Sequence, residues 1–205
     1  EGKTGAEFEA AAIAYIRAKL AKHRRIIFNG DGYSPDWVKE AEKRGLPNYP
    51  STVDCMPHYT DEKNVRILRK FGIYNREELI ARTEIHLEKY SKTRRIEART
   101  MVEMARKQLL PASLDYLDKL CTAVACKKSI GITSKSEEKI AAKLNDLCDR
   151  FYDSIERLEK QVAAACEIKD VQKQAEFYHD NVLAEMDIMR SIADEIELNM
   201  PLSYW

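Results

Sequence analysis

The stretch that decides the fold runs from Asn75 to Lys128 and reads NREELIARTEIHLEKYSKTRRIEARTMVEMARKQLLPASLDYLDKLCTAVACKK. Asn75 suits a helix N-cap, and Glu78, three residues later, can complete a capping box. At 1.5 Å per residue, one helix of this length would span roughly 75–80 Å and would need packing partners throughout. We expect Pro111 to kink the helix without ending it, because proline removes one hydrogen bond and crowds the preceding turn. Apolar or small residues recur at helical spacing: Leu79, Thr83, Leu87, Tyr90, Ala98, Met101, Ala105, Leu109, Ala112, Tyr116, Leu120 and Val124.

Two further amphipathic helices follow, with Ser136 as the expected cap of the first and a start near Asp170 for the second. Their connections are short, which favours antiparallel neighbours. The sequence therefore predicts an all-α protein in which residues 75–205 form an antiparallel helical bundle around a long, kinked central helix. The two stripes average about 3.6 residues per repeat: Ile140, Leu144, Leu147, Phe151, Ile155, Leu158, Val162 and Ala165, then Val171, Ala175, Tyr178, Val182, Met186, Met189, Ala193 and Ile196.

Residues 1–74 read as a separate N-terminal region with one helix, short helices and many turns. Ser34 is a good N-cap, Pro35 fits the first helical position, and Gly45 fits the end of that helix. The expected elements are, in order, a helix from Ala6 to about His23, an extended run Arg25–Phe28, a turn Asn29–Gly32, a helix from Pro35 to Arg44, a short turn after Ser51 or Thr52, and a helix from Thr60 or Asp61 to Gly72.

Charge and cysteine content restrict the class of protein. The chain has 34 basic and 34 acidic residues, and a protein that binds nucleic acid or anionic membranes normally carries surplus Lys and Arg. No 18-residue apolar run and no secretory signal pattern occurs. The 5 cysteines are an odd number on mostly helical patterns, as expected for free thiols in a reducing compartment. We therefore expect a cytoplasmic protein with no nucleic-acid or membrane partner.

The loop Asn29–Gly32 is the only glycine-rich loop in the sequence, so it is a candidate phosphate cradle. However, no Lys-Ser/Thr follows it as in a P-loop, and no G-x-G-x-x-G occurs. We interpret it as a tight turn in which glycine supplies positive φ angles.

Three other groupings could carry metal chemistry, and each is incomplete. The Glu-x-x-His at residues 176–179 resembles half of a di-iron site, but no second copy exists. Cys55 and His58 could be half of a zinc site, but no partner pair such as Cys-x-x-Cys is present. Cys121 and Cys126 are five residues apart, which does not match metal spacing on one helix face. We assign no catalytic, cofactor-binding or metal-binding residue.

A series of local motifs resembles the C-terminal region of type III glutamine synthetases, closely from Arg25 to Tyr116. Beyond Ser129 only the helical pattern is similar. The tail Met200–Trp205 lacks the leading Trp and the second Pro of the family's Trp-Pro-x-Pro-Ser/Thr-Tyr ending. The matching segments are Ile27–Ser34, Trp37, Glu40–Ala41, Lys43–Leu46, Asn48, Ser51–Asp54, Arg82 with Glu84–Ile85, Leu87–Glu88, Tyr90, Lys92–Thr93, Ile96–Ala98, Met104–Ala105 and Leu110–Ala112.

This resemblance implies a helical C-terminal domain of a cytoplasmic, ring-built enzyme that makes glutamine from glutamate, ammonia and ATP. The parent enzyme would use Mg or Mn at a β-barrel site between subunits. The barrel's motifs do not occur here. The Asn29–Gly32 loop lacks a preceding Lys-Pro, and Ser34 stands where the family's ATP loop has His. The chain also begins without methionine and almost within a helix, as expected for a fragment.

We therefore expect a structural and oligomerisation role, with the domain's own catalytic barrel and neighbouring subunits of a homo-oligomer as partners. The fragment alone should be inactive and should hold no cofactor. Two alternatives are an independent helical protein-interaction module and, less favoured, a small helical metalloenzyme.

Overall fold

The computed structural model describes residue 2 and residues 4–204, and within them every regular element is helical, as the sequence predicts. The chain divides into two compact units, Glu1–Pro50 and Ser51–Trp205. The sequence predicted a boundary between residues 74 and 75, whereas the two units of the structure meet between residues 50 and 51. Residues 51–74 pack with the long helix, through a small core of Val53, Met56, Leu87 and Ala175.

The first unit contains helix α1 (Gly5–Lys22), a 3-10 turn η1 (Arg24–Ile26) and helix α2 (Pro35–Lys43). The predicted caps of α2 are confirmed, because the Ser34 side chain accepts a hydrogen bond from the Trp37 amide and Gly45 has φ +71°. The extended run expected at Arg25–Phe28 is wrong over its first half. No strand in the described chain is available to pair with it, so the amides of Ile26 and Ile27 bond locally, to the carbonyls of His23 and Arg24.

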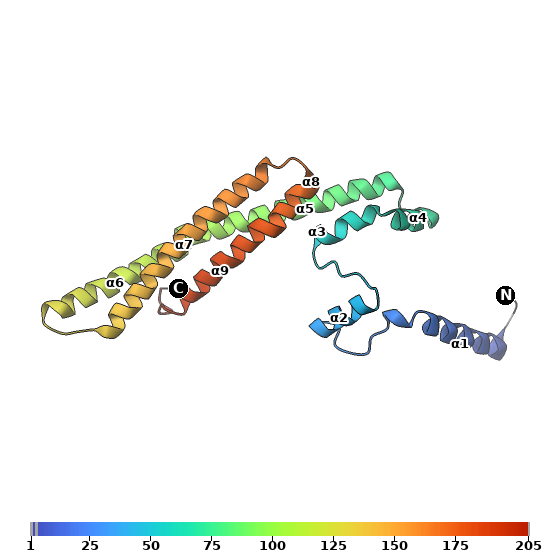
Figure 1. Cartoon of the computed structure of the whole chain (residues 1–205), viewed down its shortest axis with the longest axis horizontal. Coiled ribbons are helices and arrows are strands. Elements are labelled where there is room, and N and C mark those ends of the chain that lie inside the picture. Colours follow the sequence, from blue (N-terminus) through green and yellow to red (C-terminus); the bar gives the residue numbers. More distant parts are fainter. Residues whose placement is uncertain (1, 3, 205) are drawn as a thin grey trace. The chain divides into compact units, whose positions relative to one another are not determined.

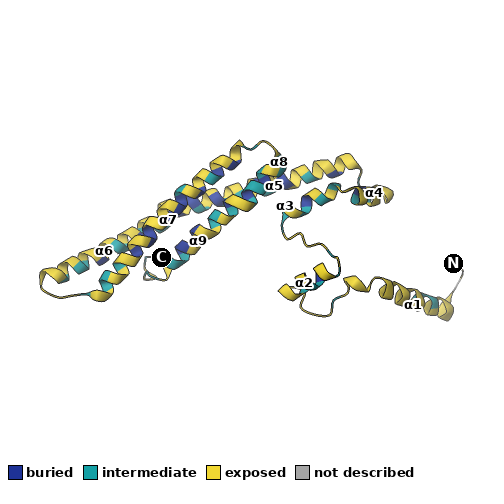
Figure 2. Ribbon diagram, in the orientation of Figure 1, coloured by how far each residue is buried: buried dark blue, intermediate teal, exposed yellow. Residues whose placement is uncertain are grey.

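The first unit has almost no core of its own. Among its described residues Ala41 alone is buried, and α1 buries no residue at all (Figure 2). The exposed large apolar side chains of α1 are Phe8, Ile13, Tyr15, Ile16 and Leu20.

The second unit is organised along one helix of 54 residues, seen as the long green and yellow rod in Figure 1. It comprises α5 (Arg76–Met104), a π-helical turn η3 (Ala105–Leu109) and α6 (Leu110–Ser129). The capping box between Asn75 and Glu78 is confirmed, with both hydrogen bonds at 2.8 Å. The helix continues through Pro111, as expected. The wider π turn directly before the proline relieves the clash between its ring and the preceding turn.

Short helices precede the long helix, and two antiparallel helices follow it. The cap expected at Ser136 is wrong: the N-cap position is Ser134, whose carbonyl accepts from the Glu138 amide. Asp170 caps the last helix as predicted, accepting from the Lys173 amide at 2.8 Å. The elements are α3 (Thr52–Cys55), a 3-10 turn η2 (Met56–Thr60), α4 (Glu62–Lys70), α7 (Lys135–Glu167), α8 (Val171–Phe177), a π turn η4 (Tyr178–Val182) and α9 (Leu183–Glu197).

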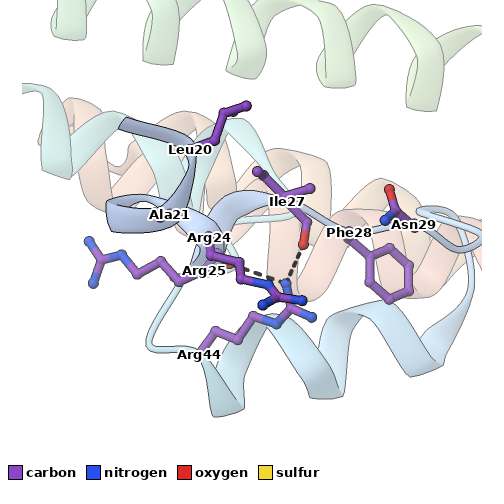
Figure 3. A pocket seen from close by; sticks show the side chains of 8 residues that line it. All are labelled: Leu20, Ala21, Arg24, Arg25, Ile27, Phe28, Asn29 and Arg44. Carbon is purple, nitrogen blue, oxygen red and sulfur yellow. Dashed lines mark hydrogen bonds between the residues drawn. The ribbon is translucent and has the colours of Figure 1, made fainter. Parts of the chain in front are cut away.

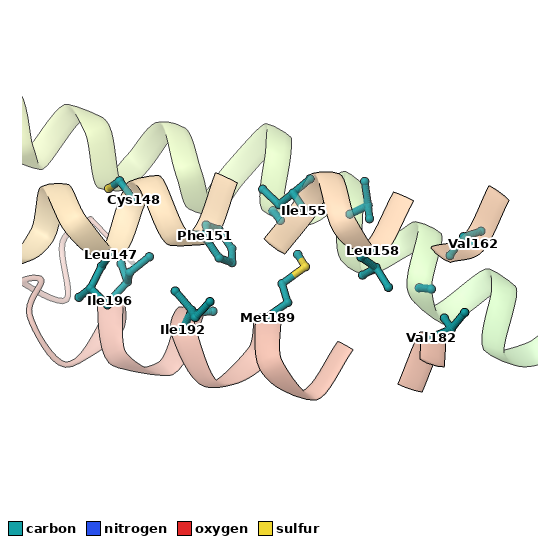
Figure 4. Close-up of a cluster of buried hydrophobic side chains, with 14 of the residues drawn as sticks. Leu147, Cys148, Phe151, Ile155, Leu158, Val162, Val182, Met189, Ile192 and Ile196 are labelled. Atoms are coloured by element: carbon teal, nitrogen blue, oxygen red, sulfur yellow. The ribbon is translucent and has the colours of Figure 1, made fainter. Parts of the chain in front are cut away.

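Most predicted stripe residues from Ala98 onward form one core between the long helix, α7 and the last helix, which consists of α8, η4 and α9 (Figure 4). Leu87 and Ala175 belong to the smaller core described above. Helix α7 packs against α6 and α9, while α5 contacts α7, α8 and α9. Ile140 is the one member of the α7 stripe whose side chain is exposed, near the start of that helix. Helix α7 and the continuous helix formed by α8, η4 and α9 contribute most of the fully or almost fully buried side chains of this core. They are Leu144, Leu147, Phe151, Ile155, Leu158, Ala165, Tyr178, Val182, Met189 and Ile196.

Candidate functional site

The glycine-rich loop Asn29–Gly32 forms a turn, but for a different reason from the one expected. Neither Gly30 nor Gly32 has a positive φ angle. A Cβ atom on Gly30 would lie 2.6 Å from the ring of Phe28, whereas a Cβ on Gly32 would meet nothing within 4 Å. Glycine at position 30 therefore allows the Phe28 ring to lie close to the backbone, and a larger residue would force that ring to shift.

Arg44, at the end of α2, forms hydrogen bonds with the segment before this loop. These contacts were not predicted from the sequence. Its Nη1 donates to the carbonyl of Ile27 at 2.6 Å and to that of Arg25 at 3.3 Å (Figure 3). Its Nε donates to Glu40 Oε1 at 2.6 Å, and this bond lowers the pKa of the Glu40 carboxyl. The guanidinium also lies over the rings of Phe28 and Trp37. Only the Glu40–Arg44 spacing of four residues was visible in the sequence.

An open cleft of about 750 Å³ lies beside Arg44 (Figure 3). Its lining combines the cations Arg24 and Arg25 with the apolar side chains of Leu20, Ile27 and Phe28. The Nε and Nη1 donors of Arg44 are already bonded to the protein itself. The lining residues include no carboxylate, histidine or thiol, so the cleft offers positive charge and apolar surface but no acid, base or nucleophile.

A second groove, of about 850 Å³, runs between α5, η3 and α7. Its two carboxylates are both paired: Arg106 Nε donates to Glu159 at 3.2 Å, and Lys107 Nζ to Glu103 at 2.6 Å. Its lining residues are Arg95, Ile96, Arg99, Thr100, Val102, Glu103, Arg106, Lys107, Glu159, Val162, Ala163 and Cys166.

The candidate metal groupings remain separate in the structure. Glu176 accepts from Gln172 at 2.8 Å, while His179 contacts Asp180 at 2.7 Å. His58 pairs with Asp61 at 3.0 Å. Within the described residues, no group of three or more His, Cys, Asp or Glu side chains could hold a metal ion. The described residues therefore do not fit the Mg or Mn that the resemblance implies.

The cysteines are all free thiols, and two titratable groups in the bundle are strongly perturbed. Burial raises the pKa of the Cys148 thiol to about 11. Burial likewise raises the pKa of Tyr178 to about 12, helped by a contact of 3.7 Å between its hydroxyl and Cys166 Sγ. Neither group lies with a base, acid or metal ligand set, so both are features of a packed core. No helix of the described chain is long and apolar enough to cross a membrane.

The fold defines the class: within the described residues the chain is all-α, with a long central helix and charged grooves on its surface. A sequence model of the glutamine synthetase C-terminal domain matches residues 11–128, more than half of the chain. The chain belongs to this family. The resemblance to type III glutamine synthetases inferred from the sequence motifs is confirmed.

Individual glutamine synthetases are also similar in sequence to this chain. The chain is 34% identical to a glutamine synthetase of Butyrivibrio fibrisolvens, over 98% of this chain and 29% of the relative. It is 30% identical to a type-3 glutamine synthetase of Dictyostelium discoideum, over 89% and 26% respectively. A glutamine synthetase of Bacteroides fragilis is 26% identical over 95% and 28%. The chain thus spans less than a third of the length of these relatives.

Proposed function

We propose that this chain is the structural C-terminal domain of a cytoplasmic glutamine synthetase, an ATP-dependent glutamate–ammonia ligase. In this role it braces the catalytic barrel of its own subunit and contributes contacts between subunits of a homo-oligomer. ATP and the divalent metal bind to the barrel, and no residue of this domain takes part in the chemistry.

The exposed apolar face of α1 carries the proposal. Fixing a residue's backbone costs roughly 1–2 kcal/mol in conformational entropy, which burial must offset. The first unit buries Ala41 alone among its described residues, while Phe8, Ile13 and Ile16 are all more than half exposed. Such a helix is stable only if another surface covers it. The barrel of the same enzyme supplies that surface in our proposal.

The carboxylates of the domain support a role outside catalysis. Phosphoryl transfer to glutamate needs several carboxylates that hold metal ions around the phosphates. On the long helix, Glu88 pairs with Lys92 at 2.8 Å and Glu103 pairs with Lys107 at 2.6 Å. These are exposed helical ion pairs, each typical of a solvated surface.

The test uses the full-length enzyme with the apolar face of α1 made polar by Phe8→Asp and Ile16→Asp. We expect loss of the native oligomer, measured by light scattering after gel filtration, and loss of activity with it, because the resemblance places the active site between subunits. Tyr33→Asp is the matched control, because Tyr33 is fully exposed in the same unit and should leave assembly unchanged. Native assembly and full activity in the α1 variant would contradict the proposal.

A second experiment addresses catalysis by the chain itself. The purified 205-residue chain should release no phosphate in an assay containing glutamate, ammonia, ATP and magnesium. Activity that disappears when a carboxylate of this chain is changed would refute the structural role. A gene whose reading frame does not continue into barrel sequence would favour an independent helical interaction module instead.

A further inference from the structure

The groove between α5 and α7 has the geometry of a vacant helix position. All of its lining residues come from α5, η3 and α7. Helix α9 also contacts α5 and α7 but contributes no lining residue. Three helices are therefore packed in a bundle, and the groove is where a fourth would lie. Residues 95–107 flank it on the long helix, a span of about 18 Å at 1.5 Å per residue.

The groove carries uncompensated positive charge around an apolar centre. It has four cations and two carboxylates, and both carboxylates are already paired, with Arg106 and Lys107. Arg95 and Arg99 form no ion pair within the described residues. They lie one turn apart, and Ile96 between them is 66% exposed. An acidic amphipathic helix matches this combination.

One π-helical turn of the bundle lines the groove, and the other contacts one of its lining residues. Arg106 and Lys107 belong to η3, and Tyr178 of η4 contacts Cys166 on the groove's edge. Pro111 explains η3, but η4 contains no proline and is not followed by one in α9. Single π turns within α-helices occur frequently at functional sites, which is a second observation in favour of this surface.

The acidic amphipathic helix that fits is α9 of a second copy of this chain. Helix α9 has five acidic residues and one basic residue. Three of the acidic residues already pair within the chain, and the two that form no ion pair within the described residues are Asp187 and Glu197. Its outer face shows Ala184, Asp187, Ile188 and Ser191, at positions i, i+3, i+4 and i+7. Ile188 is 47% exposed, Asp187 forms no ion pair within the described residues, and the two small residues allow close approach. The 15 residues of α9 span about 22 Å, close to the length of the groove.

We propose that α9 of one copy docks in the α5–α7 groove of the next, with Asp187 between Arg95 and Arg99 and Ile188 against Ile96. The two surfaces differ, so the contact is heterologous and joins copies head to tail. This inference rests on the proposed function, and it identifies which surface of the domain makes a contact between subunits.

The test measures self-association of the 205-residue chain by sedimentation velocity over a range of concentrations. Every chain compared, including the reference, carries Phe8→Asp and Ile16→Asp, which prevent association through the exposed apolar side chains of α1. We expect association that weakens in about 0.5 M salt, because salt screens surface charges. Arg95→Glu with Arg99→Glu should weaken association at least about tenfold, the factor that corresponds to roughly 1.4 kcal/mol. Asp187→Arg alone should also weaken it, and combining all three substitutions should restore it. A chain that stays monomeric at every concentration overturns the inference.

Lys135→Glu with Lys139→Glu is the matched control. It makes the same charge change at the same spacing on an exposed part of α7, and it should leave association intact. Helicity and melting temperature of every variant show whether it is folded. Association that survives the Arg95 and Arg99 changes, or a triple variant that is not restored, contradicts docking of α9.

Cys166 gives an independent measurement, since it lies on the groove's edge and is exposed. Its alkylation should slow as the wild-type chain associates, while exposed Cys121 and Cys126 on α6 react at unchanged rates. Equal slowing at all three sites would overturn the assignment of the groove. If deleting the whole domain leaves the full-length oligomer intact, the proposed function fails. If deletion disrupts the oligomer but the arginine changes do not, only this inference fails.

Discussion

The Nη1 atom of Arg44 lies 2.6 Å from the carbonyl oxygen of Ile27, seventeen residues earlier in the chain. This contact joins the end of α2 to the segment that follows α1, in a unit that has almost no buried side chains. Phe28 and Trp37, whose ring centroids are 4.5 Å apart, lie against the same guanidinium. The side chain of Arg44 thus holds the elements of the first unit together, whereas buried apolar side chains do so in the second unit.

Replacing Arg44 with Ala should loosen the Arg24–Ile27 turn without unfolding the bundle. The carbonyls of Arg25 and Ile27 lose their donor, and a typical hydrogen bond contributes about 1 kcal/mol. We expect amide hydrogen exchange at Ile26 and Ile27 to accelerate roughly five- to tenfold, measured by mass spectrometry. Lys43→Ala, at an exposed neighbouring position, is the control. Unchanged exchange in the Arg44 variant would show that the contact does not hold this turn.

Gly30→Ala should disturb the Phe28–Trp37 pair, whereas Gly32→Ala should not. The methyl group added at position 30 would overlap the Phe28 ring, which must then move away from Trp37. Aromatic pairs contribute about 0.5–1.5 kcal/mol beyond the area they bury. We expect a change in near-ultraviolet circular dichroism and in the emission of Trp37 for the first variant only. Equal effects of both variants would show that the need for glycine comes from the backbone conformation of the loop and not from contact with the Phe28 ring.

Truncating the stripe of α7 should destabilise the bundle strongly. Leu144, Phe151, Ile155 and Leu158 are each 0% exposed, so alanine at any of them leaves a cavity that costs about 2–5 kcal/mol. Urea unfolding followed by circular dichroism measures this loss. Ile140→Ala, on the same helix but 37% exposed, should cost much less. Near-neutral effects at all four buried positions would contradict the observed packing.

The second unit could be predicted largely from its sequence, because its signals are local. The capping box of Asn75 and Glu78 and the cap at Asp170 depend on residues three positions apart. The stripes from Leu144 to Ala165 and from Ala175 to Ile196 follow from helical spacing alone. Ile140 obeys the same spacing but remains partly exposed. It lies towards the α6–α7 turn, which extends past the end of α9 in Figure 1, so spacing alone could not show where the third helix stops.

The remaining features depend on contacts that are distant in sequence. No local signal distinguishes Arg44 as a donor to Ile27. The π turn at Tyr178–Val182 lies in a stretch of ordinary helix-forming spacing, without proline. The groove combines Arg95 and Arg99 with side chains of α7, a helix much later in the chain. In the sequence these arginines resemble a solvated face, because a charge run does not indicate what its neighbours are.

Raising the pH should destabilise the bundle through Cys148. Its folded pKa is about 11 because burial disfavours the thiolate, and its ordinary value is 9.0. Above about pH 9 the unfolded chain releases this proton while the folded chain keeps it, so stability falls as the pH rises from about 9 to 11. At about 1.4 kcal/mol per pKa unit, the full loss over this range is roughly 3 kcal/mol. Tyr178, whose pKa is raised from 10.0 to about 12, extends the decline in the same direction.

Urea unfolding at about pH 7, 9 and 10.5 measures this dependence. Cys148→Ala removes one titrating group, so its stability should fall less steeply over the alkaline part of this range than that of the wild type. Cys121→Ala, at an exposed thiol, should keep the wild-type slope. The folded protein should also react with a thiol reagent at Cys121 and Cys126 long before Cys148 at about pH 8, because only the thiolate is an effective nucleophile. Reaction of Cys148 as fast as these exposed thiols, or identical slopes in both variants, would show that its burial does not control its ionisation.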